Sequence, residues 1–332
     1  MAKVKLAILG CGGMAGAHAH QFKANPDVEI VALCDVDDAC TARFIERNLK
    51  DYKPAPKTYT DPAKMYSAAK PDAVVIVTPH TLHFEHGMQA IAAGCHVLME
   101  KPMVTDSTQA KTLAEAVKKS GKILTIGYNS ACSPEFAFIR DAIRKNRLGK
   151  LEIVTGFLSQ NWKKMTAGSW RQDPKLSGGG QMYDSGAHLF NSLVWSVEQP
   201  IAQVFAFTDN VGTPVDINGT VNIKFTSGTL ATIAISGNSN SNGSHLAFIF
   251  ENGLIEADGW GGSWLKLVEN GQAVKYPQIT DKAQTPMSNF VDAILGRTEP
   301  KTSPQNGIYQ SQLMDAIYES AKTGKVAAPK NT

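Results

Sequence analysis

Along the first 127 residues, short apolar runs rich in β-branched residues alternate with longer segments whose apolar positions recur every three or four residues. The short runs predict buried strands and the longer segments predict amphipathic helices. The predicted strands are residues 4–10, 29–35, 57–59, 73–78, 96–100 and 122–127, and the predicted helices are residues 14–24, 37–49, 82–93 and 107–120. This alternation is typical of βαβ units around a parallel sheet.

The pattern changes near residue 133. A helix is predicted to begin at Pro134, with the Ser133 hydroxyl as its cap, and to end at Gly149. Beyond it, apolar and polar residues alternate between turns of Gly, Asn and Ser, which is typical of antiparallel strands. These strands are predicted at residues 151–160, 202–208, 218–226, 230–236, 246–251, 254–257 and 264–268, and the final helices at 285–296 and 303–324.

The chain is therefore predicted to be an α/β protein of two domains. Residues 1–130 would form a doubly wound parallel sheet, and residues 131–332 an α+β domain with a mostly antiparallel sheet. The two terminal helices can pack back on the first domain. Apolar residues on both sides of the last strands leave a sheet face to cover, which favours a homo-oligomer, a dimer or a tetramer.

Composition agrees with this organisation and excludes several classes of protein. A length of 332 residues fits two domains of about 150 residues. The net charge is +3 and no basic run interleaves with aromatic residues, so we expect no nucleic-acid partner. No apolar stretch approaches the ~18 residues of a membrane span, and the apolar run after Lys5 is too short for a signal peptide. The five cysteines form no C-x-x-C pair, which indicates reduced thiols in a cytoplasmic protein.

A glycine-rich segment, residues 10–15, follows the first strand and opens the first helix, with the pattern G-x-G-x-x-A. Gly10 permits a tight turn, Gly12 lets the backbone approach a pyrophosphate, and Ala15 lets helix and sheet pack closely. The helix N-terminus attracts phosphates. A glycine-rich turn without a ligand would show the same pattern, so the motif needs a second signal.

Asp35 at the end of the second strand supplies that signal. A carboxylate there accepts hydrogen bonds from the adenosine ribose, and with Asp37 and Asp38 it would repel a 2′-phosphate. No arginine stands beside these residues in the sequence. The prediction is therefore NAD rather than NADP, with Asp35 as a mere helix cap being the alternative.

Candidate catalytic residues follow the later strands. Lys101 lies between Glu100 and Pro102, and a cation at this strand end could hold a substrate hydroxyl and stabilise a developing alkoxide. The alternative is a surface turn with an exposed ion pair. Asp184 and His188 are four residues apart in a predicted helix, which would put both on one face, with His188 suited to proton transfer. A chance amphipathic pair is the alternative there.

Taken together, the glycine loop, the Glu100-Lys101-Pro102 motif and the segment 178–188, G-G-G-x-x-x-D-x-x-x-H, resemble the glucose-fructose oxidoreductase/inositol dehydrogenase family, also called Gfo/Idh/MocA. The resemblance covers nearly the whole chain. It implies a Rossmann domain, a C-terminal α/β domain with a mostly antiparallel sheet, and redox chemistry on sugars, inositols or related polyols. It also implies that Lys101, Asp184 and His188 form the catalytic group, with His188 as proton donor or acceptor.

The resemblance further implies a set of cofactor and substrate contacts. The cofactor-binding residues expected are Gly10, Gly12, Gly13, Met14, Asp35, Thr78, Pro79, His83, Glu100, Lys101, Asn129, Trp170 and Arg171. The substrate-binding residues expected are Lys101, Trp162, Asp184 and His188, where Trp162 is either a platform for a sugar ring or ordinary core. The segment 128–130 departs from the family, which often carries an arginine just after the asparagine.

Other histidines are not expected to act in catalysis. No metal site is expected, because helical spacing turns His86 roughly 240° away from His80, so the two cannot share an ion with His83. His18 and His20 are expected to be packing or solvated residues.

The leading prediction is an NAD-dependent dehydrogenase that acts on a sugar or inositol. Two alternatives stay open. One is a glycosidase that uses NAD transiently and yields no net NADH, and the other is a ligand sensor that has lost catalysis. The presence of Lys101, Asp184 and His188 together speaks against the sensor.

Overall fold

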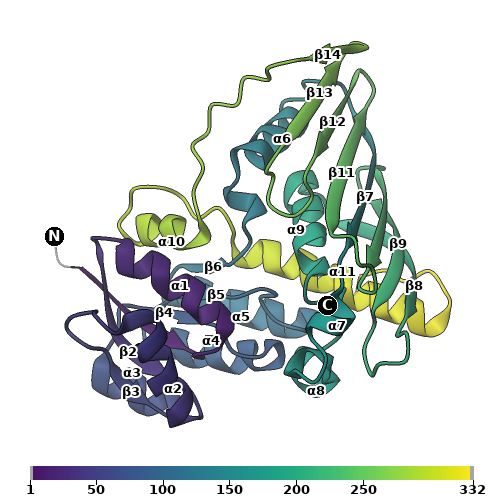
Figure 1. Ribbon diagram of the computed structural model, residues 1–332. Coiled ribbons are helices and arrows are strands. Elements are labelled where there is room, and N and C mark those ends of the chain that lie inside the picture. The colour runs from purple at the N-terminus through teal and green to yellow at the C-terminus, as the bar shows by residue number, and fades with distance from the viewer. Residues whose placement is uncertain (1–2, 330–332) are drawn as a thin grey trace. The chain divides into compact units, whose positions relative to one another are not determined.

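The computed structural model describes residues 3–329, which form two compact units (Figure 1). The first unit holds the chain up to Gly127 together with Thr285–Gln305. The second holds Tyr128–Gln284 and the chain from Asn306 onward. No helix among the described residues is both long and apolar enough to cross a membrane.

The first unit contains a six-stranded sheet in the order β3-β2-β1-β4-β5-β6, and every neighbouring pair is parallel. Its strands are β1 Val4–Leu9, β2 Val28–Cys34, β3 Lys57–Tyr59, β4 Ala73–Ile76, β5 His96–Met99 and β6 Leu124–Ile126. The strand order reverses between β1 and β4. In doubly wound sheets, ligands bind beyond the carboxyl ends of the strands at this reversal.

The helices of this unit are α1 Gly13–Ala24, α2 Asp38–Phe44, α3 Pro62–Ala69, α4 His83–Ala92, α5 Ser107–Ser120 and α10 Pro286–Ile294. Helix α5 has the predicted bounds, because Asp106 caps its start and Gly121 ends it at φ +66°. The single helix predicted at 37–49 is wrong in detail, since α2 ends at Phe44 and a π-helical turn continues to Leu49.

Helix α10 belongs to the first unit although it follows the whole second sheet in sequence. Its Met287, Phe290 and Val291 lie in the same buried core as Ala19 and Phe22 of α1. Of the two terminal helices, only α10 returns to this unit, because α11 (Pro304–Thr323) supplies Leu313, Met314 and Ile317 to the core of the second.

The second unit contains an eight-stranded sheet in the order β14-β13-β12-β11-β7-β10-β9-β8 (Figure 1). Its strands are β7 Leu151–Ser159, β8 Ile201–Asp209, β9 Asn218–Phe225, β10 Leu230–Ser236, β11 Gly243–Phe250, β12 Gly253–Ala257, β13 Leu265–Glu269 and β14 Gln272–Val274. The β7–β10 pair is parallel and the other pairs are antiparallel. The prediction of a mostly antiparallel sheet is therefore confirmed.

The helices of the second unit are α6 Pro134–Arg144, α7 Trp162–Met165, α8 Pro174–Ser177, α9 Gly186–Val197 and α11. Apolar side chains of α6, α9 and α11 share one core with alternate residues of the sheet, so one sheet face is covered by helices. Two predicted bounds are corrected. Helix α6 ends at Arg144 rather than Gly149, and α9 begins at Gly186, so Asp184 lies in the turn before it.

Candidate active site

The glycine loop of the first unit has the backbone that a dinucleotide requires. Gly10 has φ +91°, and a Cβ there would lie 2.7 Å from the carbonyl oxygen of Val77, so only glycine fits. A Cβ at Gly12 or Gly13 would meet no heavy atom within 4 Å. Helix α1 begins behind Gly12 with no acidic residue in its first turn, where Met14 is half exposed. This open, positively polarised helix end fits the pyrophosphate of a dinucleotide.

Asp35 connects the glycine loop to the end of β2. Its Oδ2 accepts the Cys11 N–H at 2.8 Å and its Oδ1 accepts the Asp37 N–H at 3.1 Å. Asp37, not Asp35, caps α2, which removes the alternative of Asp35 as a helix cap. A carboxylate offers about four lone pairs, so Asp35 retains acceptor capacity for ribose hydroxyls.

One premise of the cofactor prediction is wrong. Arg43 Nη2 lies 3.3 Å from Asp37 Oδ2, with both side chains more than half exposed. Helix α2 brings this arginine back to the acidic residues, although six positions separate it from Asp37 in the sequence. A cation that could meet a 2′-phosphate is therefore present at this end of β2.

The turn that carries Lys101 is anchored by a buried pair. His18 Nε2 of α1 lies 2.6 Å from Glu100 Oε1, and Glu100 Oε2 accepts the Lys101 N–H at 2.9 Å. Burial alone would raise the pKa of Glu100, but the hydrogen bond and charge of His18, with Lys101, outweigh it and lower the pKa to about 2. Since Glu100 is buried, the alternative of a surface turn with an exposed ion pair is wrong.

His83 does not present its ring to a cofactor, contrary to the sequence-based expectation. Its side chain is fully buried, with Nδ1 2.7 Å from the Pro102 carbonyl oxygen and Nε2 2.9 Å from that of Thr78. Burial lowers its pKa more than these two carbonyls raise it. His83 therefore ties the strand end at Thr78 and Pro79 to the turn after Lys101. Thr78, Pro79 and Lys101 themselves are half buried at this edge.

We expect Glu100→Gln to destabilise the protein by roughly 3 kcal/mol at pH 7. The folded pKa of about 2 lies below the ordinary value of 4.5, so the stabilisation is present above pH 4.5 and is lost as the pH falls toward 2. The difference from wild type should narrow to roughly 2 kcal/mol at pH 3.5 in urea unfolding. Glu46→Gln, which breaks an exposed pair with Lys50, should change stability by less than about 1 kcal/mol. If Glu100→Gln lowers the free energy of unfolding by the same amount at pH 3.5 and pH 7, the lowered pKa of Glu100 would be contradicted.

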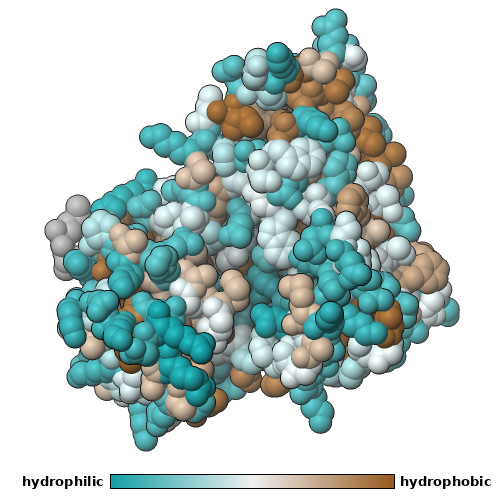
Figure 2. Space-filling view, viewed as in Figure 1, coloured by the Kyte–Doolittle hydropathy of each residue, from teal (hydrophilic) through white to brown (hydrophobic). Residues whose placement is uncertain are grey.

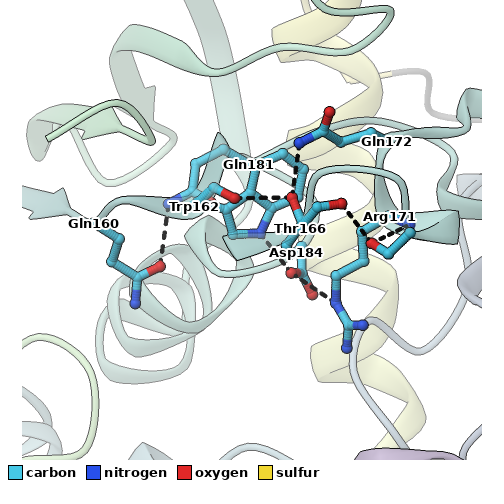
Figure 3. Close-up of polar contacts among 8 residues, drawn as sticks. Gln160, Trp162, Thr166, Arg171, Gln172, Gln181 and Asp184 are labelled. Atoms are coloured by element: carbon cyan, nitrogen blue, oxygen red, sulfur yellow. Dashed lines mark hydrogen bonds and ion pairs between the residues drawn. The ribbon is translucent and has the colours of Figure 1, made fainter. Parts of the chain in front are cut away.

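In the second unit, two side chains converge on Asp184 (Figure 3). Trp162 Nε1 donates a hydrogen bond to Asp184 Oδ2 at 2.7 Å, and Arg171 Nε donates to the same oxygen at 3.1 Å. The Arg171 guanidinium also lies over the Trp170 ring, 4.6 Å from its centroid. Arg171, expected to reach the cofactor, thus acts as a partner of Asp184 within this unit.

Trp162 is core rather than a platform for a sugar ring. It is 2% exposed and packs against Val215 and Ile217. Thr166 Oγ1 donates to the Trp162 carbonyl oxygen at 2.8 Å, and Gln172 Nε2 donates to that hydroxyl at 2.9 Å (Figure 3). This local network holds the indole N–H against Asp184.

The glycine turn before Asp184 is fixed by Asp216, a buried carboxylate. Asp216 accepts the N–H of Gly180 at 2.8 Å, the N–H of Met182 at 2.9 Å and the Tyr318 hydroxyl at 2.5 Å. A Cβ at Gly180 would lie 1.9 Å from the Asp216 carbonyl oxygen. The close approach therefore requires glycine and sets the path of the chain into Asp184.

His188 lies in the first turn of α9 and is 8% exposed. The Trp260 ring stacks on its imidazole, with centroids 4.1 Å apart and planes at 22°. Tyr128 meets it edge-on at 5.9 Å and 89°. The next residue, Asn129, is exposed.

Sequence reasoning missed His18, Tyr128, Asp216 and Trp260 as partners of the site. Only His18 carried a local signal, since it lies on the buried stripe of α1 with Ala15, Ala19 and Phe22, where a polar residue needs a partner. The other partners come from distant segments. Within residues 3–329, no three His, Cys, Asp or Glu side chains gather as metal ligands would.

Comparison with known proteins adds to this geometry. Residues 4–128 match the model of an oxidoreductase family with an NAD-binding Rossmann fold, and residues 136–256 match the C-terminal domain of the same family. The chain belongs to the Gfo/Idh/MocA family. Residues 4–128 match its NAD(P)-binding Rossmann domain.

Curated relatives within the Gfo/Idh/MocA family include D-glucoside 3-dehydrogenase of Escherichia coli, 28% identical over 200 residues, or 59% of this chain and 55% of that protein. D-xylose 1-dehydrogenase [NADP(+)] of Haloarcula marismortui is 25% identical over 264 residues, or 76% of this chain and 73% of that one. The chain spans little more than half, 52–59%, of the length of D-glucoside 3-dehydrogenase and of two further curated relatives. The WlbA dehydrogenase structure from Bordetella pertussis has the same fold, with a TM-score of 0.85, 20% identity and coverage of 99% of this chain and 100% of that one.

Proposed function

We propose that this protein is an NAD-dependent dehydrogenase that transfers a hydride between nicotinamide and a CH–OH group of a sugar, inositol or related polyol. The observation that carries the proposal is that each candidate catalytic residue is held by specific partners, through the backbone of Lys101 and through the side chains of Asp184 and His188. Glu100 and His18 anchor the backbone of Lys101, Trp162 and Arg171 hold Asp184, and Trp260 stacks on His188. Side chains this constrained suit catalysis, which requires fixed geometry.

In the proposed reaction, NAD when bound supplies the hydride acceptor. His188 takes the proton of the substrate hydroxyl while the hydrogen on the same carbon leaves with its electron pair, so an alcohol becomes a carbonyl. The Lys101 ammonium stabilises the charge that develops on the hydroxyl oxygen. Asp184, with Oδ2 held by Trp162 and Arg171, accepts a hydrogen bond from a neighbouring hydroxyl. The proposal requires Lys101 of the first unit to act on the same substrate as Asp184 and His188.

The names of the relatives support a sugar substrate, since one acts on D-glucosides and another on D-xylose. The test is NADH formation at 340 nm with purified protein, NAD and a panel of glucose, galactose, xylose, myo-inositol, scyllo-inositol and methyl glycosides. We expect NADH with at least one free sugar, glycoside or inositol. Release of sugar from a methyl glycoside without net NADH would replace the proposal with the redox-neutral glycosidase. NAD binding with no reaction of any panel member would favour the sensor.

We expect Asp35→Ser to lower the ratio of kcat/KM for NAD to that for NADP by about 10- to 100-fold, because a hydrogen bond to a charged group contributes about 1.5–3 kcal/mol. The measurement is initial rates with each cofactor at saturating substrate. Asp51→Ser is the matched control, since Asp51 is exposed in the same unit and is not one of the acidic residues at the end of β2. An unchanged ratio in Asp35→Ser would contradict the choice of NAD. A wild-type preference for NADP that Arg43→Ala abolishes would assign the pocket to NADP instead.

We further propose that residues 1–130 are the cofactor domain and that the domain from residue 131 binds substrate and self-associates. The outer face of the eight-stranded sheet exposes Ile153, Phe157, Phe207, Leu230 and Ile249, and hydrophobic side chains gather along the strands of this unit (Figure 2). Exposed apolar surface of this kind marks an interface. Sedimentation should show a dimer or tetramer, and a monomer at micromolar concentration would contradict self-association.

A further inference from the structure

Trp260 lies in the loop between β12 and β13, beyond residue 256, where the match to the family's C-terminal domain ends. Its indole nevertheless stacks on the His188 ring, with centroids 4.1 Å apart and planes at 22°. Tyr128 meets the imidazole edge-on. One face of His188 is therefore covered by a residue that no part of the sequence pattern singled out.

The loop that carries Trp260 has a defined conformation, which hydrogen bonds to the carboxylate of Asp258 stabilise. Asp258 Oδ1 accepts the Trp260 N–H at 3.1 Å and the Ser244 hydroxyl, and Oδ2 accepts the Ser263 hydroxyl at 3.0 Å. Burial alone would raise the pKa of Asp258, but these hydrogen bonds outweigh it and lower the pKa. The acceptor is thus ionised near neutral pH, and charge-assisted hydrogen bonds of this kind are the stronger ones.

The same loop is docked on α9, the helix of His188. The Ser192 hydroxyl of α9 donates to the Gly259 carbonyl oxygen at 2.8 Å. A Cβ at Gly259 would lie 2.3 Å from Leu189 Cδ1, so the backbone of the loop packs closely on the Leu189 side chain. The loop therefore contacts Leu189 and Ser192, which follow His188 on the same helix. These contacts fix the position of the indole relative to the imidazole.

We propose that Trp260 is a positioning residue for His188: its indole face restricts rotation of the imidazole and holds the ring nitrogen in the direction from which it takes the hydroxyl proton. This role rests on the proposed function. An imidazole has a broad, shallow torsion at χ2, so its direction is set by packing rather than by its own rotamer. Stacking also stabilises the ring once it has gained the proton, because the indole face attracts a cation.

The kinetic test is Trp260→Leu. We expect kcat to fall at least tenfold, with the dissociation constant of NAD within twofold and KM for substrate within threefold, because binding of both ligands does not require a correctly turned imidazole. Trp260→Phe should recover most of kcat, since it keeps an aromatic face. Tyr276→Leu removes an exposed aromatic side chain of the same unit and should leave kcat unchanged. Unchanged kcat in Trp260→Leu, a loss confined to KM, or a Phe variant no better than Leu would overturn the proposal.

A second measurement does not depend on activity. In protein with labelled histidine, the ring signals of His188, assigned with His188→Gln, should be shifted upfield by the ring current of Trp260. They should move downfield in Trp260→Leu, provided that its melting temperature shows a folded protein. Signals in the same position in the Leu variant would show that the rings do not stack and would overturn the proposal. If the His188 signals are shifted upfield but the protein oxidises no member of the panel, the ring stack is present and the proposed dehydrogenase activity is contradicted.

Discussion

His188→Ala is expected to lower kcat for the preferred substrate by about 10²–10⁴-fold, the range that a positioned general base contributes. The dissociation constant of NAD should stay within about twofold, because the glycine loop and Asp35 belong to the first unit and His188 to the second. Stopped-flow measurement of NADH formation, together with NAD titration, separates the two effects.

The control for this prediction is His20→Ala. His20 is exposed on α1 and should be replaceable without loss of turnover. If His188→Ala kept full turnover at neutral pH, the proton would have to be taken by another group, and Lys101 would be the first to test. If both NAD affinity and kcat collapsed, the substitution would have damaged the fold. The role of His188 as general base would then be tested with the more conservative variant His188→Gln.

The largest effect on stability is expected from Gly180→Ala. The added methyl would lie 1.9 Å from the Asp216 carbonyl oxygen and 2.7 Å from its nitrogen, and both are backbone atoms that cannot rotate away. We expect a loss of about 3–5 kcal/mol in the free energy of unfolding, because a backbone shift would also break the hydrogen bonds that Asp216 accepts. Urea unfolding monitored by the near-ultraviolet signal of the second unit measures this loss.

Gly243→Ala is the matched control for Gly180→Ala. A Cβ at Gly243 would lie 3.6 Å from Phe157, an ordinary contact, so its cost should stay within about 1 kcal/mol. Any folded Gly180→Ala protein should retain NAD binding and lose turnover, because the displaced turn leads into Asp184. Equal stability of the two variants would mean that the glycine turn tolerates a side chain, contrary to the geometry.

The alternation of apolar runs predicted the parallel and antiparallel halves because strand and helix periods are local properties. The ends of helices could also be predicted, since Asp106 and Gly121 mark the start and the end of α5 in the structure as they do in the sequence. Three features were not local. The π-helical turn at 45–49, the parallel pairing of β7 with β10, and the return of α10 to the first unit depend on packing between distant segments.

The candidate site shows the same division. Gly10 and Asp35 could be placed from sequence, because a strand end followed by a glycine turn has few conformations. The partner of Glu100 could not, since His18 is 82 positions away. Trp260 illustrates the limit further, because its ring contact with His188 joins a loop and a helix 72 positions apart, and no spacing rule connects them. His83 was misassigned because its two carbonyl partners become visible only in three dimensions.

The crossing of the chain between units affects synthesis on the ribosome. The core of the first unit is incomplete until Phe290 of α10 has been synthesised, and the core of the second is incomplete until Leu313 and Ile317 of α11 have been synthesised. At a translation rate of about 5–20 residues per second, the N-terminal sheet remains for roughly ten seconds or more without α10, which completes its core. A message cut short before residue 285 would therefore yield two unfinished domains rather than one sound domain and one lost, since the last part of the chain completes both.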